Sequence, residues 1–284
     1  MNTLLYIVWN PSEEAFRLGS FGIRWYSLCW LIGLVLAYFL VKKLYKEQKI
    51  KDEYFDPLFI YCFLGILVGA RLGHCLFYEP GYFLSSWQHV VEMFIPFKNI
   101  NGSWEFSGYA GLASHGGTLG LMLALYLYYR RTHVSLWTVL DNIAIATPIT
   151  ACFIRLGNLM NSEIIGKVTD VPWAFIFQNA EPALSTQPRH PGQLYEAIAY
   201  FVFFFIGWYL YRKKPAKVGT GYFFGLCLTL IFTARFFIEF TKINQVDFEN
   251  SLPLDMGQLL SLPFVILGVF CMLRSNKKKE GEKI

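Results

Sequence analysis

Charged residues are scarce in this chain, and their scarcity limits what kind of protein it can be. Asp, Glu, Lys and Arg make up 16% of the 284 residues, whereas hydrophobic residues make up 55% and aromatic residues 18%. Soluble globular domains contain about 25% charged residues. The net charge of +5 comes from short clusters and not from one continuous face, which argues against a nucleic-acid partner. The composition therefore predicts a membrane protein.

Motifs for metal binding, redox chemistry and nucleophilic catalysis are also missing. The six cysteines lie in apolar stretches without the spacing of zinc or redox sites, and the histidines have no ligand-like spacing. We find neither a Gly-x-Ser-x-Gly elbow nor a His-Glu-x-x-His motif. We therefore predict no metal and no cofactor, and we expect any nucleophile to come from a second substrate. Residues 1–9 lack a basic region, so we expect no cleavable signal peptide there.

Long apolar stretches are what the chain has in abundance. Seven of them approach the roughly 20 residues that a helix needs to cross a bilayer. We see no soluble domain, low-complexity segment or internal repeat, so we expect residues 1–284 to form one all-α membrane domain, a polytopic bundle of about seven transmembrane helices. The predicted spans are 23–41, 57–78, 112–129, 137–159, 194–211, 219–240 and 256–273.

Lysine and arginine are divided unequally between alternate loops. One set of loops contains sixteen of them: Lys42, Lys43, Lys46, Lys49, Lys51, Arg130, Arg131, Arg212, Lys213, Lys214, Lys217, Arg274, Lys277, Lys278, Lys279 and Lys283. The other set contains five: Arg17, Lys98, Lys167, Arg189 and Lys242. Because basic loops remain in the cytoplasm, this asymmetry predicts a cytoplasmic C-terminus and an external N-terminus.

With this orientation, several spans carry polar residues into one layer, the outer half of the membrane. Arg155 and Asn158 lie near the outer end of the fourth span, and Arg235 and Glu239 lie near that of the sixth. His115 lies at the outer start of the third span. An arginine at membrane depth costs about 2.5 kcal/mol or more, so it should face a partner or a polar cavity. Its planar donors suit a phosphate, so we expect a single site for a phospholipid head group.

The types of residue in this layer suggest roles. Arg155 and Arg235 would hold a phosphate through charge-assisted hydrogen bonds. Glu163, Glu196 and Glu239 would orient the arginines or balance their charge. A structural ion pair between Arg235 and Glu239, four residues apart on one helix face, remains the alternative.

His115 is the candidate general base, because the neighbouring glycines would allow a ligand close to the backbone. A packing histidine beside a tight helix contact is the alternative. Tyr26, at the outer start of the first span, belongs either to the site or to an aromatic belt at the membrane surface. Asp141, at the inner start of the fourth span, is expected to serve a helix terminus and not the site.

Seven short motifs follow one another along the chain, and the central one is Arg155-Leu-Gly-Asn158-Leu-Met-Asn161-Ser-Glu163-Ile-Ile-Gly166. In this order, the motifs resemble those of the bacterial prolipoprotein diacylglyceryl transferases. Ile154 stands where that family usually has a glycine and Gly192 where a serine is common, and neither difference removes a charge. The motifs lie at 25–26, 69–73, 115–120, 155–166, 189–196, 234–240 and 256–261.

The resemblance implies an enzyme of the bacterial inner membrane. Such an enzyme transfers the diacylglyceryl group of phosphatidylglycerol to the thiol of the lipobox cysteine in a prolipoprotein signal peptide. This first step of lipoprotein maturation releases glycerol 1-phosphate. The resemblance implies that phosphatidylglycerol is bound by Arg155, Asn158, Glu163, Gly166 and Arg235. It implies catalytic roles for His115, Arg235, Tyr26 and Glu239, with either His115 or Tyr26 as the base.

Charged residues inside a membrane also mark transport pathways, so an anion or lipid transporter is one alternative function. A non-catalytic phospholipid-binding protein is another. The inner halves of the predicted spans carry almost no polar residues and the chain has no repeated halves, which argues against a transporter. The outer loops, 79–111 and 160–192, are rich in aromatic residues, and we expect them to cover the site at the membrane surface.

Overall fold

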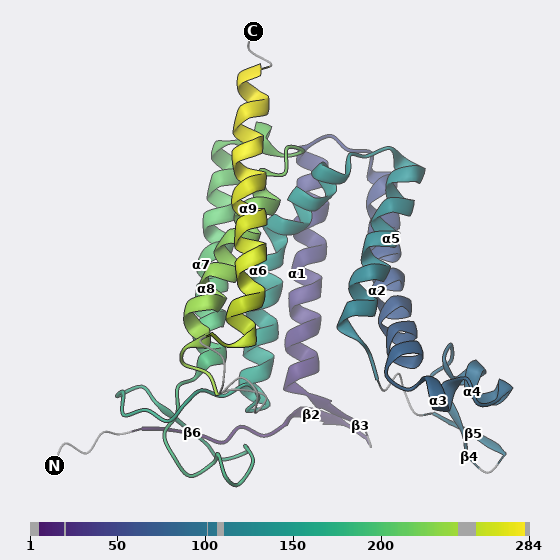
Figure 1. Cartoon of the computed structure of the whole chain (residues 1–284), viewed down its shortest axis with the longest axis vertical. Coiled ribbons are helices and arrows are strands. Elements are labelled where there is room, and N and C mark those ends of the chain that lie inside the picture. The colour runs from purple at the N-terminus through teal and green to yellow at the C-terminus, as the bar shows by residue number, and fades with distance from the viewer. Residues whose placement is uncertain (1–5, 20, 101, 107–110, 244–253, 282–284) are drawn as a thin grey trace. The chain divides into compact units, whose positions relative to one another are not determined.

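The structure is a computed structural model that describes residues 6–19, 21–100, 102–106, 111–243 and 254–281. Seven long helices dominate the described chain, one at each predicted span (Figure 1): α1 (Trp25–Glu47), α2 (Phe55–Phe77), α5 (Ser114–Thr132), α6 (Leu136–Met160), α7 (Gly192–Lys213), α8 (Tyr222–Glu239) and α9 (Met256–Gly281). The predicted helical membrane bundle is thereby confirmed. Within the described residues, six of these helices, all except α5, are long and apolar enough to cross a membrane. That α5 also crosses remains a prediction.

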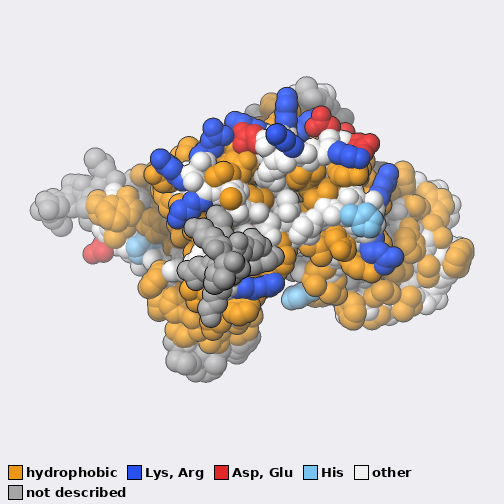
Figure 2. Space-filling view, turned by 90° about the horizontal axis from the view of Figure 1, so that it is seen from above, with side chains coloured by type: hydrophobic (Ala, Val, Ile, Leu, Met, Phe, Trp, Pro, Cys, Tyr) orange, Lys and Arg blue, Asp and Glu red, His pale blue; other side chains and the backbone are white. Residues whose placement is uncertain are grey.

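Several helices run past the ends of their apolar stretches. α1 continues from the predicted end at residue 41 to Glu47, and α9 continues from residue 273 to Gly281. Lysine and glutamate are good helix formers, so a helix persists where the hydropathy has already fallen. The last turns of α1, α5 and α7 are basic. Figure 2 looks onto the face at which α9 ends, and lysine and arginine side chains gather there among hydrophobic ones.

Short elements in the connecting segments escaped the sequence prediction, because they are too short to show a period. The described strands form three two-stranded sheets, with β1 and β6 parallel and the pairs β2–β3 and β4–β5 antiparallel. The strands are β1 (Ile7–Trp9), β2 (Glu14–Leu18), β3 (Phe21–Arg24), β4 (Phe97–Ile100), β5 (Ser103–Phe106) and β6 (Phe175–Phe177). The short helices are α3 (Pro80–Phe83), α4 (Trp87–Glu92) and the 3-10 helices η1 (Asp52–Tyr54) and η2 (Pro215–Lys217).

The chain divides into two compact units, and each is described by itself. The larger unit comprises Met1–Leu44 and Trp137–Ile284, which include most of α1 and all of α7, α8 and α9. It also contains nearly all of α6. The smaller unit, Tyr45–Leu136, contains α2 to α5. The single domain expected over residues 1–284 remains a prediction.

In the larger unit, α6 is more extensively buried than the other candidate spans. Near its start, the buried Asp141 carboxylate accepts hydrogen bonds from the backbone N–H groups of Gly219 (2.9 Å), Gly221 (3.0 Å) and Phe224 (2.8 Å). The first N–H groups of a helix have no partner within it, and Asp141 supplies one at the start of α8. The expected helix-terminal role of Asp141 is confirmed, but it serves α8 and not α6.

In the smaller unit, glycines hold α2 and α5 together. Gly69 and Gly73 of α2 face Gly116 of α5 so closely that a Cβ at Gly116 would lie 2.2 Å from the Gly69 carbonyl oxygen. Gly120 approaches the carbonyl oxygen of Gly65 in the same way. Small residues allow this close contact between helix backbones in a membrane. Gly116, beside His115, thus serves a helix contact, and the approach of a ligand that we expected beside these glycines stays a prediction.

Arg71, near the end of α2, anchors the segment that follows this helix. Its guanidinium donates to the carbonyl oxygens of Glu92 (2.9 Å) and Met93 (3.4 Å). The Glu92 carboxylate is fully buried and accepts hydrogen bonds from the Tyr82 hydroxyl (2.9 Å) and the Asn99 N–H (3.0 Å). Burial and the bond to Glu92 raise the pKa of Tyr82. These contacts connect α2 to α3, α4 and β4. They therefore give Arg71 a structural role.

The α2–α5 contact predicts opposite outcomes for two neighbouring substitutions. Gly116→Ala should lower the thermal midpoint of the detergent-purified protein, because overpacking a tight contact typically costs about 1–3 kcal/mol. Gly117→Ala is the matched control, since a Cβ there would lie 3.4 Å from the nearest atom, an ordinary contact. It should leave the midpoint unchanged or raise it, because alanine favours a helix over glycine by up to about 1 kcal/mol. Equal midpoints for the two variants would contradict this account of the interface.

Candidate functional site

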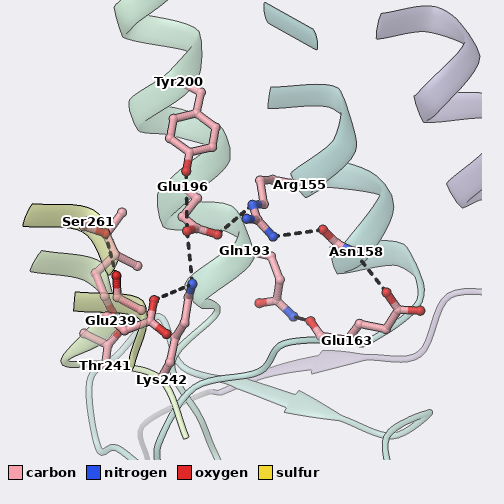
Figure 3. Close-up of polar contacts among 12 residues, drawn as sticks. Arg155, Asn158, Glu163, Gln193, Glu196, Tyr200, Glu239, Thr241, Lys242 and Ser261 are labelled. Carbon is pink, nitrogen blue, oxygen red and sulfur yellow. Dashed lines mark hydrogen bonds and ion pairs between the residues drawn. The ribbon is translucent and has the colours of Figure 1, made fainter. Parts of the chain in front are cut away.

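The residues of the central motif lie at the end of α6 and in the loop after it (Figure 3). Arg155 Nη1 donates to Asn158 Oδ1 at 3.2 Å, and Asn158 Nδ2 donates to Glu163 Oε2 at 3.0 Å. Asn161 Nδ2 donates to the other oxygen of the same carboxylate at 3.0 Å. Arg155 and Asn158 are three residues apart and share one face of the helix, as the sequence predicted. Asn158 therefore connects the guanidinium to a carboxylate in the loop, and Asn161 holds the other oxygen of that carboxylate.

The loop after α6 has an unusual backbone conformation. Ser162 and Ile164, on either side of Glu163, have φ angles of 53° and 56°. This left-handed conformation is rare for a β-branched residue such as Ile164 and costs about 1–3 kcal/mol. Two contacts hold Glu163 between them: its N–H donates to the Asn158 carbonyl oxygen at 3.0 Å, and its own carbonyl oxygen accepts from Gln193 Nε2. Backbone strain that is maintained by contacts is typical of a functional loop.

Glu196 of α7 joins this cluster to a second one. Its carboxylate is completely buried, and Oε2 lies 2.8 Å from Arg155 Nε. The geometry of that contact is not that of a hydrogen bond, so the attraction is electrostatic. The other oxygen, Oε1, accepts a hydrogen bond from Lys242 Nζ at 3.0 Å. Lys242 Nζ also donates to Glu239 Oε2 at 3.1 Å, so an unbroken chain of polar contacts runs from Glu163 to Glu239.

Lys242 is the residue that the sequence prediction missed. We counted it among the basic residues of the outer loops, yet it is only 4% exposed and lies between two carboxylates. Counting basic residues treats every loop lysine alike, which is why its burial could not be recognised. One signal was present: Glu239 precedes it by three residues, a spacing at which side chains meet on a helix.

Arg235 of α8 does not form the ion pair with Glu239 that we considered as the alternative to phosphate binding. Glu239 forms its ion pair with Lys242, and the described residues include no ion pair for Arg235. Arg235 Nε is buried and has no hydrogen-bond partner in the described chain. A buried donor without a partner is costly, by about 1–3 kcal/mol, and an anion would relieve that cost.

Two glycines allow the backbone to approach this cluster. A Cβ at Gly166 would lie 2.5 Å from the His190 carbonyl oxygen and 2.7 Å from that of Thr241, so only glycine fits where these three segments meet. A Cβ at Gly257, in the first turn of α9, would lie 2.8 Å from Glu239 Oε1. The carboxylate thus packs against the positive end of a helix dipole.

Burial lowers the pKa of His190, which favours its neutral form.

The two candidate bases lie in different units. Tyr26, at the start of α1 in the larger unit, has its ring against α6, where a Cβ at Gly157 would lie 3.0 Å from its Cδ2. His115 lies in the first turn of α5 in the smaller unit, and its side chain is exposed. None of the hydrogen bonds or ion pairs among the described residues uses the His115 ring, and both its catalytic and its packing interpretation stay predictions. Its relation to Arg155 remains a prediction.

In the part of the chain that the structure describes, no three His, Cys, Asp or Glu side chains are placed to hold a metal ion. The polar chemistry is instead that of carboxylates, guanidinium groups, a lysine and amides. Such a set can bind and neutralise a phosphate within an apolar bundle.

A comparison with known protein families agrees with the sequence motifs. A family model described as prolipoprotein diacylglyceryl transferase matches residues 13–274. The chain belongs to this family. The resemblance inferred from the motifs is therefore confirmed, and the chain is a transferase of the membrane. The match includes both the polar cluster around Glu196 and His115.

Relatives of the prolipoprotein diacylglyceryl transferase family match over nearly the full length. A protein of Bacteroides fragilis is 59% identical over 279 residues, which cover 98% of each chain. One of Chloroherpeton thalassium is 42% identical over 284 residues, covering 100% of this chain and 99% of the relative. One of Porphyromonas gingivalis is 40% identical over 291 residues, covering 98% of each. All three are named phosphatidylglycerol–prolipoprotein diacylglyceryl transferase.

Proposed function

We propose that this chain transfers the diacylglyceryl group of phosphatidylglycerol to the thiol of the lipobox cysteine in a prolipoprotein signal peptide. The sulfur forms a bond to a glycerol carbon, and the bond from that carbon to the phosphate oxygen breaks. The electron pair of the broken bond leaves with glycerol 1-phosphate, and the thiol proton passes to a base. The observation that carries the proposal is the polar cluster in which Arg155 meets the buried Glu196, itself paired with the buried Lys242, at the ends of apolar helices. The names of the relatives support the choice of substrates.

Arg155 would bind the phosphate of the lipid head group. Its partners Glu196 and Asn158 hold the guanidinium in one orientation, yet 19% of the side chain remains exposed and accessible to a ligand. The leaving group gains negative charge as the carbon–oxygen bond breaks, and a cation fixed beforehand stabilises that charge without reorganisation. Glu163 and Gly166 would maintain the loop that holds Asn158 in place.

Arg235 would supply the second positive charge, since its buried Nε has no partner among the described residues and an anion would provide one. Glu239 would act through Lys242, with which it is paired at 3.1 Å. We further propose that His115 takes the thiol proton, with Tyr26 as the alternative base. A cysteine thiol is mostly protonated at neutral pH, with a pKa of about 8.5, so a base would accelerate the attack.

We place the site in the outer half of the bacterial inner membrane. The basic last turns of α1, α5 and α7 support a cytoplasmic position for the ends of these helices. The loops at 79–111 and 160–192 then lie outside. Exposed aromatic side chains in them, such as Trp87, Trp104 and Trp173, suit the membrane–water interface.

The proposed phosphate site predicts that activity tolerates substitution by lysine less well at Arg155 than at Arg235. The test supplies the purified protein with phosphatidylglycerol and a lipobox peptide, and it measures the thioether product and free glycerol phosphate. Arg155→Lys should lose at least about 90% of the wild-type rate, because lysine keeps the charge but not the planar fork. Arg235→Lys should retain more activity than Arg235→Ala, because charge is what this residue contributes. Wild-type turnover in Arg155→Lys would contradict the phosphate role, and the absence of any thioether product from wild type would contradict the transferase proposal.

The role of His115 as the base predicts a specific dependence on pH. His115→Gln should be slow at neutral pH and recover partly at high pH, where the peptide thiol ionises unaided. Rates of wild type and variant should be compared from about pH 6 to about 9.5, a range that brackets ordinary histidine and thiol pKa values. A ratio of rates that stays constant across this range, in a variant that folds normally, would exclude His115 as the base and favour Tyr26.

The proposed orientation predicts which cysteine substitutions can be labelled from outside. Lys98→Cys and Lys167→Cys, both at exposed positions, should react with a membrane-impermeant maleimide in spheroplasts. Lys213→Cys, also at an exposed position, is the matched control and should react only after the membrane is permeabilised. The six native cysteines are buried or half-buried, so they should add little background. The reverse pattern would overturn the orientation and the outer position of the site.

A further inference from the structure

Lys242 is held more firmly than a loop lysine would be. Its side chain is buried, with Nζ 3.0 Å from Glu196 Oε1 and 3.1 Å from Glu239 Oε2. Its backbone N–H donates to the Glu239 carbonyl oxygen at 3.0 Å, and its backbone forms a β-bridge with Gly166. The ammonium group is therefore fixed at one point by the end of α8, by α7 and by the loop after α6.

The position of Lys242 decides how Glu196 interacts with Arg155. Glu196 directs Oε2 to Arg155 and Oε1 to Lys242, so each oxygen serves one cation. A carboxylate and a guanidinium left to themselves favour a two-pronged pair in which both oxygens engage the fork of N–H groups. That pair would occupy the same planar donors that a phosphate needs. In this structure Lys242 attracts the second oxygen, which also accepts a hydrogen bond from the Tyr200 hydroxyl at 3.5 Å.

We propose that Lys242 is a positioning residue, which holds one oxygen of Glu196 away from Arg155 and so keeps the guanidinium free for a phosphate. The inference rests on the proposed function, because the phosphate is that of the phosphatidylglycerol head group. Lys242 does not touch the reacting atoms, and its effect on the reaction passes through Glu196.

The inference predicts a loss of lipid affinity when the lysine charge is removed. Lys242→Met should raise the KM for phosphatidylglycerol by about tenfold or more, equivalent to about 1.4 kcal/mol, with a smaller change in kcat. The measurement uses the full-length protein in mixed micelles with a saturating lipobox peptide. Lys98→Met is the matched control: this lysine is exposed and lies outside the cluster, and the KM of the variant should remain within about twofold of wild type, far below one tenfold step. An unchanged KM in a folded Lys242→Met would overturn the inference.

A second substitution separates positioning from a structural role. In Lys242→Met/Glu196→Gln, the neutral amide cannot neutralise Arg155, so the KM should fall again by at least about threefold relative to the single variant. Lys242→Arg, which keeps the charge, should stay closer to wild type than Lys242→Met. If Lys242 were only structural, the double variant would lose a further buried contact and its KM would not recover, and that result would overturn the inference.

A failure of the proposed function and a failure of the positioning role of Lys242 give different results in these experiments. If wild type transfers no diacylglyceryl group, the proposed function fails, whereas normal wild-type transfer with an unaltered KM in Lys242→Met contradicts the positioning role alone. If Lys242→Met does not fold, Lys242→Met/Glu239→Gln takes its place, because it removes one cation and one anion together. Glu196 still loses its lysine in that variant, so the KM for phosphatidylglycerol should rise, and a wild-type KM would contradict the inference.

Discussion

The buried carboxylate of Glu196 is the group on which the polar end of the larger unit depends. It lies between Arg155 of α6 and Lys242 after α8, and it belongs to α7. A charge in apolar surroundings is stable only when it is paired, and removing one partner of a buried pair costs about 3–5 kcal/mol. Glu196 is the partner that both cations share, so its loss would remove the carboxylate paired with Arg155 and one of the two carboxylates paired with Lys242. The charges keep the helix ends together, and the helix ends keep the charges at fixed distances.

The backbone around this cluster is shaped so that the charges can meet. Gly166 and Gly257 allow segments to approach where a side chain would collide with a carbonyl oxygen or with Glu239. Ile164 adopts a left-handed conformation that its branched side chain disfavours. These are costs to the stability of the fold, and the hydrogen bonds of Glu163 and Gln193 offset them locally. The arrangement holds Arg155 rigidly while part of its surface stays exposed, which suits a group that must meet a charge as it develops.

Much of the fold and part of the candidate site could be predicted from the sequence. Apolar length located all seven helices, and the spacing of Arg155 and Asn158 predicted their shared face, because both signals are local. The partner of Glu239 is not a local property: Arg235 and Lys242 lie on either side of it at helical spacings, and only the path of the chain after α8 makes Lys242 the partner. The short strands were not predicted because their pairing is not local either: β1 and β6 pair across more than 160 residues.

The glycine-rich motif that contains His115 has two parts with different physical explanations. Gly116 and Gly120 are accounted for by their contact with α2, where any larger residue would collide with the backbone. His115 is not accounted for in this way, because the residue is exposed and is not among the nearest neighbours of these glycines. The packing of the smaller unit therefore provides a reason for the glycines and none for the histidine. That His115 serves the transfer reaction stays a prediction.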